Sequence, residues 1–312
     1  MSIPAGYDGP INPNPTGSES TITAFGYVPN RALACIGVLV FLLALIAHIA
    51  LCVKIKSTRA FQALFAFGCL LETVGYCVRV VGHYRPFDVS YYVAQFTLIV
   101  IAPSAFSAGL FLSLSIAIRR LSWGMGHGLL SFSPRILVYV FGAIDLVTTV
   151  IQITGASLVG VSESRRLRSG GQQGVGSIST SQANDILVAG LAIQTASFLA
   201  FLIILILVTY RSNMTRPAVL KRKLTGLMIA TSFLVFLRTT FRLAETSQGV
   251  FGPAATNEVL FATLEFVPIG MAVSLWAYFS LDSMLPPELE HDQVEKWEGR
   301  TYSFSGSTVG RL

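Results

Sequence analysis

Charged side chains stand inside stretches of this sequence that are otherwise strongly apolar. If such stretches span a membrane, each central charge costs about 2.5–3.5 kcal/mol on insertion scales and therefore needs a partner or a function. The ionisable members of this set are Glu72, Arg79, Asp145, Arg238, Arg242, Glu245, Glu258 and Glu265. Three are basic and five are acidic, so complete pairing leaves two acids that must be protonated, solvated or facing a cation.

Helical spacing groups these residues on shared faces. Glu72, Tyr76 and Arg79 recur at positions i, i+4 and i+7 of one apolar stretch. The other groups are Asp145 with Gln152, then Arg238, Arg242 and Glu245, then Glu258 with Glu265, while Gln95 and Gln194 add one amide each. We expect these twelve side chains to form an intramembrane polar network. Two interpretations stay open: ion pairs that hold helices together, or a substrate-binding site.

Two more specific expectations follow from the same residues. Arg238 and Arg242 should bind an acid on Glu72, Asp145 or Glu265, because two arginines a turn apart would otherwise be uncompensated. Glu258 and Glu265 stand about 10 Å apart along a helix and could pass a cation in steps. The alternative is that these two acids merely pair with Arg79 and Arg242.

The composition identifies the elements that must position these groups. Of 312 residues, 53% are hydrophobic and only 12% are charged, with a mean hydropathy of +0.64. Soluble domains carry about 25% charged residues, so a soluble globular enzyme is excluded. The net charge of +6 fits cytoplasmic loops held at anionic lipid better than nucleic-acid binding.

The apolar runs predict an all-α membrane protein with a bundle of seven transmembrane helices. The predicted spans are Ala32–Val53, Ala60–Val81, Tyr91–Ile118, Pro134–Val161, Asn184–Tyr210, Leu224–Leu243 and Asn257–Leu281. A polar segment, 1–24, is expected to be a disordered extracellular lead rather than a signal peptide. Residues 25–287 are expected to form the seven-span domain, and 288–312 are expected to be a disordered cytoplasmic tail.

Lys and Arg counts beside the spans predict the orientation. Fourteen flank one side of the predicted spans, five flank the other and three lie inside them. Basic residues concentrate on the cytoplasmic side, so the N-terminus is expected outside and the C-terminus inside. With this orientation, the polar side chains converge on the outer half of the bundle.

Several kinds of chemistry have no counterpart in the sequence. No nucleotide-binding run of the form G-x-x-x-x-G-K-[ST] occurs, so we expect no ATP hydrolysis. The four histidines are scattered and the four cysteines form no C-x-x-C pair, so neither a metal site nor a cofactor is predicted. The last span contains no Lys for a retinal Schiff base. We therefore expect a protein that is not an enzyme.

An ordered series of short motifs resembles a known fungal family. The motifs include Gly68-Cys69-x-x-Glu72-x-x-Gly75-Tyr76-x-x-Arg79, Asp145 with Gln152-x-x-Gly155, Arg238-x-x-x-Arg242-x-x-Glu245, and Glu258 with Glu265. In these positions the chain is similar to the seven-span lipid-translocating exporters, which are linked to aminocholesterol resistance and to export of sphingoid long-chain bases. The similarity covers about residues 25–287.

The resemblance implies a protein that moves or exports amphiphilic lipids of the sphingoid-base or sterol kind and confers resistance to toxic amphiphiles. Its expected partners are membrane lipids or amphiphilic small molecules, with no nucleic acid, and its expected location is the plasma membrane. Protein partners stay unassigned. The alternative function is a seven-span sensor of lipid or drug stress that signals through its cytoplasmic loops.

Overall fold

The structure, a computed structural model, describes residues 9–16, 19–23, 25–122, 134–168, 179–215, 222–249 and 252–285. Six long helices come first: α1 Arg31–Lys54, α2 Arg59–Tyr84, α3 Val89–Ser122, α4 Pro134–Arg168, α5 Thr180–Thr215 and α6 Arg222–Ser247. The seventh rod joins α7 Glu258–Leu260, the π-helical η1 Phe261–Phe266 and α8 Val267–Tyr278, and the short α9 Leu281–Met284 follows. All seven rods are long and apolar enough to cross a membrane, so the predicted fold class is confirmed.

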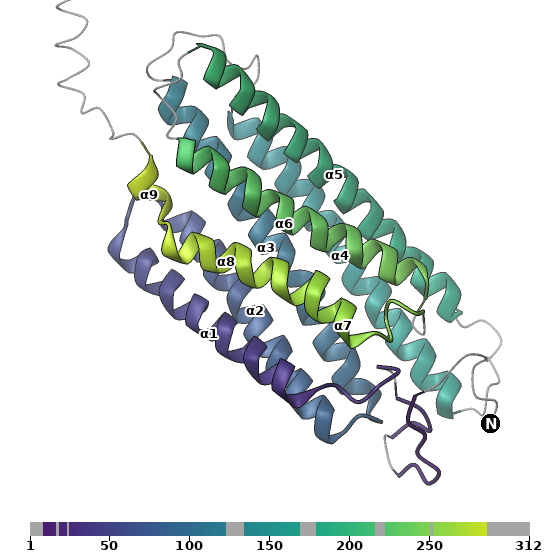
Figure 1. The fold of residues 1–312 in the computed structure, drawn as a ribbon. Coiled ribbons are helices and arrows are strands. Elements are labelled where there is room, and N and C mark those ends of the chain that lie inside the picture. The colour runs from purple at the N-terminus through teal and green to yellow at the C-terminus, as the bar shows by residue number, and fades with distance from the viewer. Residues whose placement is uncertain are drawn as a thin grey trace, which may run out of the picture.

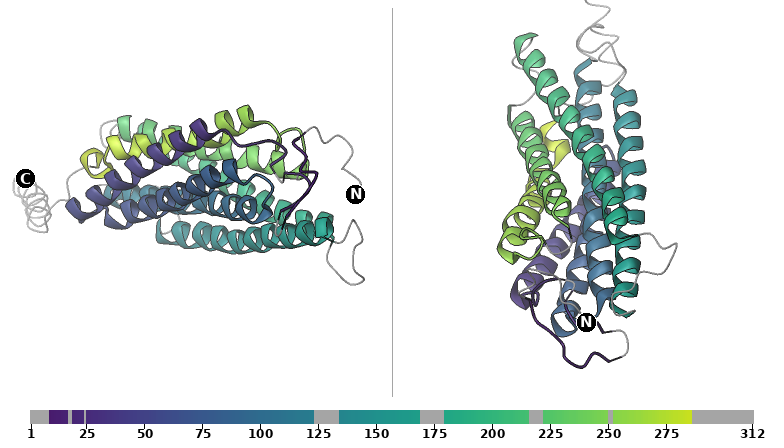
Figure 2. Two further views of the ribbon diagram at one scale, coloured as in Figure 1. Left: turned by 90° about the horizontal axis from the view of Figure 1, so that it is seen from below. Right: turned by 90° about the vertical axis from the view of Figure 1, so that its right-hand side faces the viewer.

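The rods run side by side as one elongated bundle (Figure 1). Each helix contacts the next, α8 closes the ring against α1, and α3 also reaches across to α6. Accordingly, 72% of the most apolar part of α3 is buried inside the bundle, against 22% of the corresponding part of α1. The helix ends near Arg31, Tyr84 and Glu258 define what we call the N-terminal end of the bundle, opposite the end that carries α9 (Figure 2). Which end faces the cytoplasm stays a prediction.

Asparagines begin two of the rods. The Asn30 side chain accepts hydrogen bonds from the backbone N–H groups of Ala32 and Leu33. Asn257 does the same for Val259 and Leu260 at the start of the seventh rod. Such caps satisfy backbone donors that a helix start leaves free.

Aromatic side chains fill the centre of the bundle, and small residues let helices approach closely. Phe65 packs against Phe61, Phe106 and Trp276, with ring centroids 4.6, 5.4 and 6.3 Å away. The indole N–H of Trp276 donates to the Thr231 hydroxyl at 3.0 Å. A Cβ at Gly37 would stand 2.2 Å from the Tyr76 ring, so only glycine permits this contact between α1 and α2.

Two prolines alter the backbone where polar groups gather. Pro103 lies inside α3 and has no N–H, so it cannot bond to the carbonyl oxygen of Ile99 one turn earlier. Pro268 is the second residue of α8, which follows the π-helical segment directly, and at that boundary the N–H of Val267 reaches back to the carbonyl of Ala262. Such π segments are rare and often occur at functional sites.

The described part of the N-terminal segment folds back on the bundle. The N–H of Ser20 donates to the carbonyl of Phe87 at 2.8 Å, and Ile22 and Thr23 are buried. The expectation of a disordered lead did not anticipate these contacts. The predicted tail, 288–312, lies outside the described residues, as does most of the loop between α4 and α5. The four cysteines, Cys35, Cys52, Cys69 and Cys77, are free thiols.

Candidate functional site

The centre of the predicted polar network is an ion-pair cluster between α6 and η1. The Arg238 guanidinium donates to the Glu265 carboxylate at 2.6 Å, and Arg242 reaches the same carboxylate at 3.2 Å. Arg242 also pairs with Glu245 at 2.7 Å, one turn along α6. All four side chains are largely buried, and two positive and two negative charges make the cluster neutral. Of the three acids expected as possible partners of the two arginines, Glu265 is the one that binds both.

A second ion pair ties α2 to the seventh rod at the N-terminal end. Arg79 donates to Glu258 at 2.8 Å and to the Tyr27 hydroxyl at 3.0 Å, while its guanidinium lies over the Phe261 ring at 4.2 Å. The Glu258 carboxylate also accepts the backbone N–H of Asn30 at 2.7 Å. Burial raises the pKa of Tyr27, which lies just before α1, although Arg79 opposes that rise. The phenol therefore stays protonated at neutral pH.

These pairs identify the two acids that pairing leaves over. Glu258 and Glu265 are both paired with arginines, which agrees with the alternative stated above. Neither is therefore a free acid that could pass a cation to the other. The remaining acids are Glu72 and Asp145, which are 2% and 3% exposed. Glu72 faces the charges of Arg238, Arg242 and Glu265 without a direct bond to them. Among the described residues, no three His, Cys, Asp or Glu side chains converge as metal ligands would.

The predicted amides divide between two places. Gln152 on α4 donates to Gln194 on α5 at 2.7 Å, and Gln194 donates to Ser104 on α3 at 3.0 Å. Gln95 is buried elsewhere on α3, and its side-chain oxygen has no hydrogen-bond partner. Tyr76 packs among aromatic rings, with Phe41 at 5.3 Å and Phe266 at 5.7 Å. The network is therefore split into an ion-pair region and an amide region.

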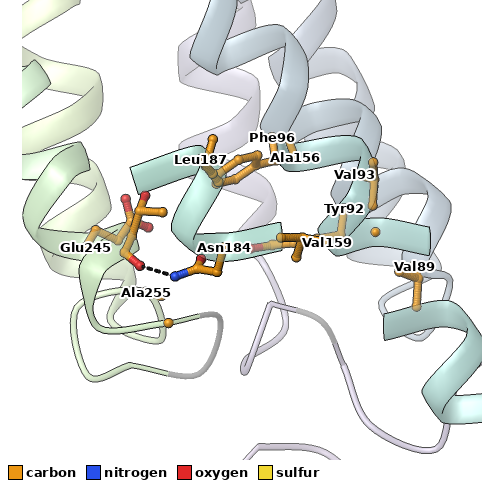
Figure 3. A pocket seen from close by; sticks show the side chains of 13 residues that line it. Val89, Tyr92, Val93, Phe96, Ala156, Val159, Asn184, Leu187, Glu245 and Ala255 are labelled. Carbon is orange, nitrogen blue, oxygen red and sulfur yellow. Dashed lines mark hydrogen bonds between the residues drawn. The ribbon is translucent and has the colours of Figure 1, made fainter. Parts of the chain in front are cut away.

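A pocket with a cavity volume of about 40 Å³ opens at the N-terminal end between α3, α4, α5 and α6. Its walls are mainly apolar and come from Val89, Val93, Phe96, Ala156, Val159, Leu187 and Ala255. Polar groups line one part of it, where Glu245 on α6 stands beside Asn184 on α5, across the pocket from Val89 and Val93 (Figure 3). Asn184 is held by a bond to the carbonyl of Thr246 at 3.1 Å.

The pocket and the ion-pair cluster share one wall. Glu245 lines the pocket while its carboxylate is paired with Arg242. The Arg242 guanidinium in turn lies over the ring of Phe96, a pocket residue, at 4.7 Å. An anionic group on an apolar wall can attract the cationic head of an amphiphile, while the aliphatic part contacts the surrounding apolar side chains. The arrangement could therefore bind a cationic head group at Glu245 in exchange for Arg242.

Several contributors were missed by sequence reasoning. Tyr27 and Asn30 precede the first span, and the Ile99 carbonyl, which accepts from Arg238 at 2.6 Å, leaves no mark in side-chain patterns. A proline four residues after Ile99 was the one available signal, because it frees that carbonyl. Asn184 and Phe96 carry no periodic polar pattern that distinguishes them from other residues of their spans.

Three proteins of Saccharomyces cerevisiae are similar to this chain. The chain is 27% identical to Protein RTM1 of Saccharomyces cerevisiae over 226 residues, 70% of this chain and 66% of that protein. It is 28% identical to the sphingoid long-chain base transporter RSB1 of a Saccharomyces cerevisiae strain over 181 residues, 57% of this chain and 43% of the relative. Protoporphyrin uptake protein 1 of the same species is 24% identical over 70% of this chain and 69% of its own length.

No solved structure matches the chain. The family model described as RTA1 like protein matches residues 65–288, which contain the motifs quoted above, most of α2 and all the rods that follow it. The resemblance seen in the sequence is thereby confirmed, and this multi-pass membrane protein belongs to the RTA1-like family.

Proposed function

We propose that this protein translocates cationic amphiphiles of the sphingoid-base kind across the plasma membrane and so confers resistance to them. The observation that carries the proposal is the pocket whose apolar walls meet the carboxylate of Glu245. A long-chain amine has the matching parts, since its ammonium can pair with a carboxylate and its chain can remain against apolar side chains or lipid. One relative is a sphingoid long-chain base transporter, and this similarity supports the same substrate class.

The ion-pair cluster gives the pocket a way to accept and release a cation. Glu245 is bonded to Arg242, and Arg242 has a second acid, Glu265, at 3.2 Å. An incoming ammonium that binds Glu245 therefore does not leave Arg242 unpaired, because Arg242 keeps its bond to Glu265. Exchange between two bonded arrangements avoids the cost of an isolated charge in the membrane.

No nucleotide-binding motif occurs in the sequence, so we propose movement that does not depend on ATP hydrolysis. Under the predicted orientation the pocket opens on the extracellular half of the membrane. It would then receive or release amphiphiles at the outer leaflet.

Reconstitution in liposomes tests the proposal. Purified protein should speed movement of a fluorescent sphingoid base between leaflets, measured by extraction into albumin, without ATP or other proteins. A neutral long-chain alcohol with the same fluorophore should move no faster than in empty liposomes. A sensor would bind the amine without moving it, so binding without accelerated movement would contradict the transport proposal.

A pair of variants assigns the effect to the pocket. Glu245→Gln keeps the shape of the side chain but removes the charge, and transport should fall about tenfold or more. Asp185→Asn is the matched control, because Asp185 lies on α5 at the same end of the bundle but is exposed and does not line the pocket. Equal transport by the two variants would remove Glu245 from the mechanism.

A further inference from the structure

The interface of α3, α4 and α5 contains a layer of hydrogen-bonded polar side chains. Ser104 and Thr149 bond through their hydroxyls at 2.6 Å, Gln194 donates to Ser104 at 3.0 Å and Gln152 to Gln194 at 2.7 Å. We call Ser104, Thr149, Gln152 and Gln194 the amide layer. One face of each of the three helices is thereby fixed at this level.

Nearer the opposite end of the bundle, the same three helices meet again through aromatic rings. Phe111 on α3 lies 5.5 Å from Phe141 on α4 and 4.6 Å from Phe201 on α5, between ring centroids. Phe141 and Phe201 are themselves 6.0 Å apart. This aromatic layer closes the interface on the side away from the N-terminal end.

Three polar side chains fall between the two layers. Ser107 is three residues after Ser104 and four before Phe111, Asp145 lies midway between Phe141 and Thr149, and Ser197 is three residues after Gln194 and four before Phe201. Residues three or four apart lie on the same helix face, so all three occupy one level of the same interface.

The oxygen atoms at this level have no hydrogen-bond partners. Both carboxylate oxygens of Asp145 and the hydroxyls of Ser107 and Ser197 are buried and unbonded. Gln194 faces the Asp145 carboxylate without a hydrogen bond of ordinary geometry, and no cationic side chain of the described residues pairs with it. A lone carboxylate that is 3% exposed is costly in a membrane interior unless something compensates its charge.

We propose that Asp145, Ser107 and Ser197 form a binding site for a bare alkali cation, Na⁺ or K⁺. Hard cations of this kind are coordinated by oxygen atoms, and one carboxylate balances one positive charge. A divalent ion would leave a net positive charge and usually needs more carboxylate ligands. A proton on Asp145 would neutralise the carboxylate, but the hydroxyls of Ser107 and Ser197 would still have no hydrogen-bond partner.

A long-chain amine does not fit this position. Between the pocket and the amide layer, Gly155 on α4 packs directly on the backbone of α5, where an added Cβ would stand 2.8 Å from the backbone nitrogen of Leu187. The two helices are in backbone contact there, which leaves no width for an aliphatic chain. The cation site is therefore separate from the pocket, and its test does not depend on transport.

Thermal unfolding of the purified full-length protein in detergent tests the site. Ligands that bind only the folded state raise the unfolding temperature, and the rise grows with the logarithm of the ligand concentration once that exceeds the dissociation constant. At constant ionic strength, replacing N-methylglucamine chloride by NaCl or KCl should raise it by about 2–4 °C at a tenfold excess over the dissociation constant. The salt that acts at lower concentration identifies the preferred ion.

Variants assign the response to the three residues. Asp145→Asn should abolish the alkali-dependent shift, and Ser107→Ala and Ser197→Ala should each raise the required concentration several-fold. Ser113→Ala is the matched control, because this buried serine of α3 bonds only to the carbonyl of Leu110 in its own helix and should respond like the unaltered protein.

Three results would overturn the proposal. They are an equal unfolding temperature in all three chlorides, a full alkali response in Asp145→Asn, and stabilisation by acid alone without any alkali dependence, which would mean a protonated Asp145. The serine variants keep the test informative even if Asp145→Asn does not yield folded protein.

Discussion

Arg238 joins Glu265 and the carbonyl oxygen of Ile99 through one nitrogen, with both contacts at 2.6 Å. It thereby connects α6 to the π-helical segment of the seventh rod and to the centre of α3. The Ile99 carbonyl is available because Pro103 has no N–H to offer it. In a membrane such freed carbonyls must be satisfied from another element, and here a charged side chain fulfils that need.

Arg238→Ala should therefore sharply reduce the amount of folded protein. It leaves Glu265 with only its longer contact to Arg242 and leaves the Ile99 carbonyl unbonded, and breaking a buried pair from one side typically costs about 3–5 kcal/mol. The readout is the monodisperse fraction in detergent and its unfolding temperature. Arg238→Ala combined with Glu265→Gln should recover part of the loss, and an unfolding temperature of the single variant equal to that of the wild type would contradict this role.

Pro103→Ala should weaken the dependence on Arg238. The new N–H at position 103 can bond to the Ile99 carbonyl, so the arginine is no longer its sole donor. A double-mutant cycle of Pro103→Ala and Arg238→Ala should then show a coupling of about 1 kcal/mol, with the arginine substitution costing less in the alanine background. Strictly additive effects would show that the proline and the arginine act independently.

A pair of glycine substitutions should separate close helix packing from helix propensity. In Gly37→Ala the new Cβ would stand 2.2 Å from the Tyr76 ring, so α1 and α2 must move apart at a cost of about 1–3 kcal/mol. Gly142→Ala on α4 is the control, since its Cβ would meet nothing within 4 Å. Thermal unfolding should show a loss of several degrees for the first and a small gain for the second, because alanine favours the helix more than glycine does. Similar values for the two variants would argue against a packing role for Gly37.

The seven spans could be predicted from the sequence because apolar run length depends on bilayer thickness alone. That Arg238 and Arg242 would pair with a buried acid was also predictable, because buried charges of opposite sign must meet, although three acids stayed open as partners before Glu265 was seen to bind both. Helix spacing, however, does not say which spans are neighbours. It therefore could not show that Asp145 would be left without an ion partner, and it left pairing of Glu258 with Arg79 as one of two alternatives.

Backbone features were the least visible in the sequence. The π-helical turn at Glu265 arises from a shift in hydrogen bonding that no side-chain pattern encodes, although Pro268 marks the place where the regular ladder must break. The pocket was likewise out of reach, because it requires four helices and the positions at which they diverge. Among the described residues, Glu245 is the only charged residue that lines the pocket. The sequence places it on a helix face with Arg238 and Arg242 but does not show that it lines a pocket.

Epitope tags on intact cells should show the N-terminus outside and the C-terminus inside. The basis is the count of Lys and Arg in the sequence, with fourteen beside one side of the predicted spans and five beside the other. A tag at the N-terminus should bind antibody without permeabilisation, and a tag at the C-terminus should bind only after it. The reverse pattern would place the pocket at the cytoplasmic face and would change the leaflet from which substrate enters.

Because the pocket and the ion-pair cluster share one wall, substitutions of Arg242 and Glu245 should change the affinity for an amine in opposite directions. Arg242 occupies the Glu245 carboxylate that the proposed amine must bind, at 2.7 Å. Replacing it in Arg242→Gln should free that carboxylate and tighten binding of a sphingoid base, whereas Glu245→Gln should weaken it. Charge-assisted hydrogen bonds contribute about 1.5–3 kcal/mol, so each change should alter the dissociation constant by about tenfold or more. Binding of a fluorescent base to folded, monodisperse protein measures both variants, and Arg238 should keep Glu265 paired in Arg242→Gln. Parallel losses in the two variants would mean that Glu245 and Arg242 act only as a structural pair, and that the amine binds without exchanging places with the arginine.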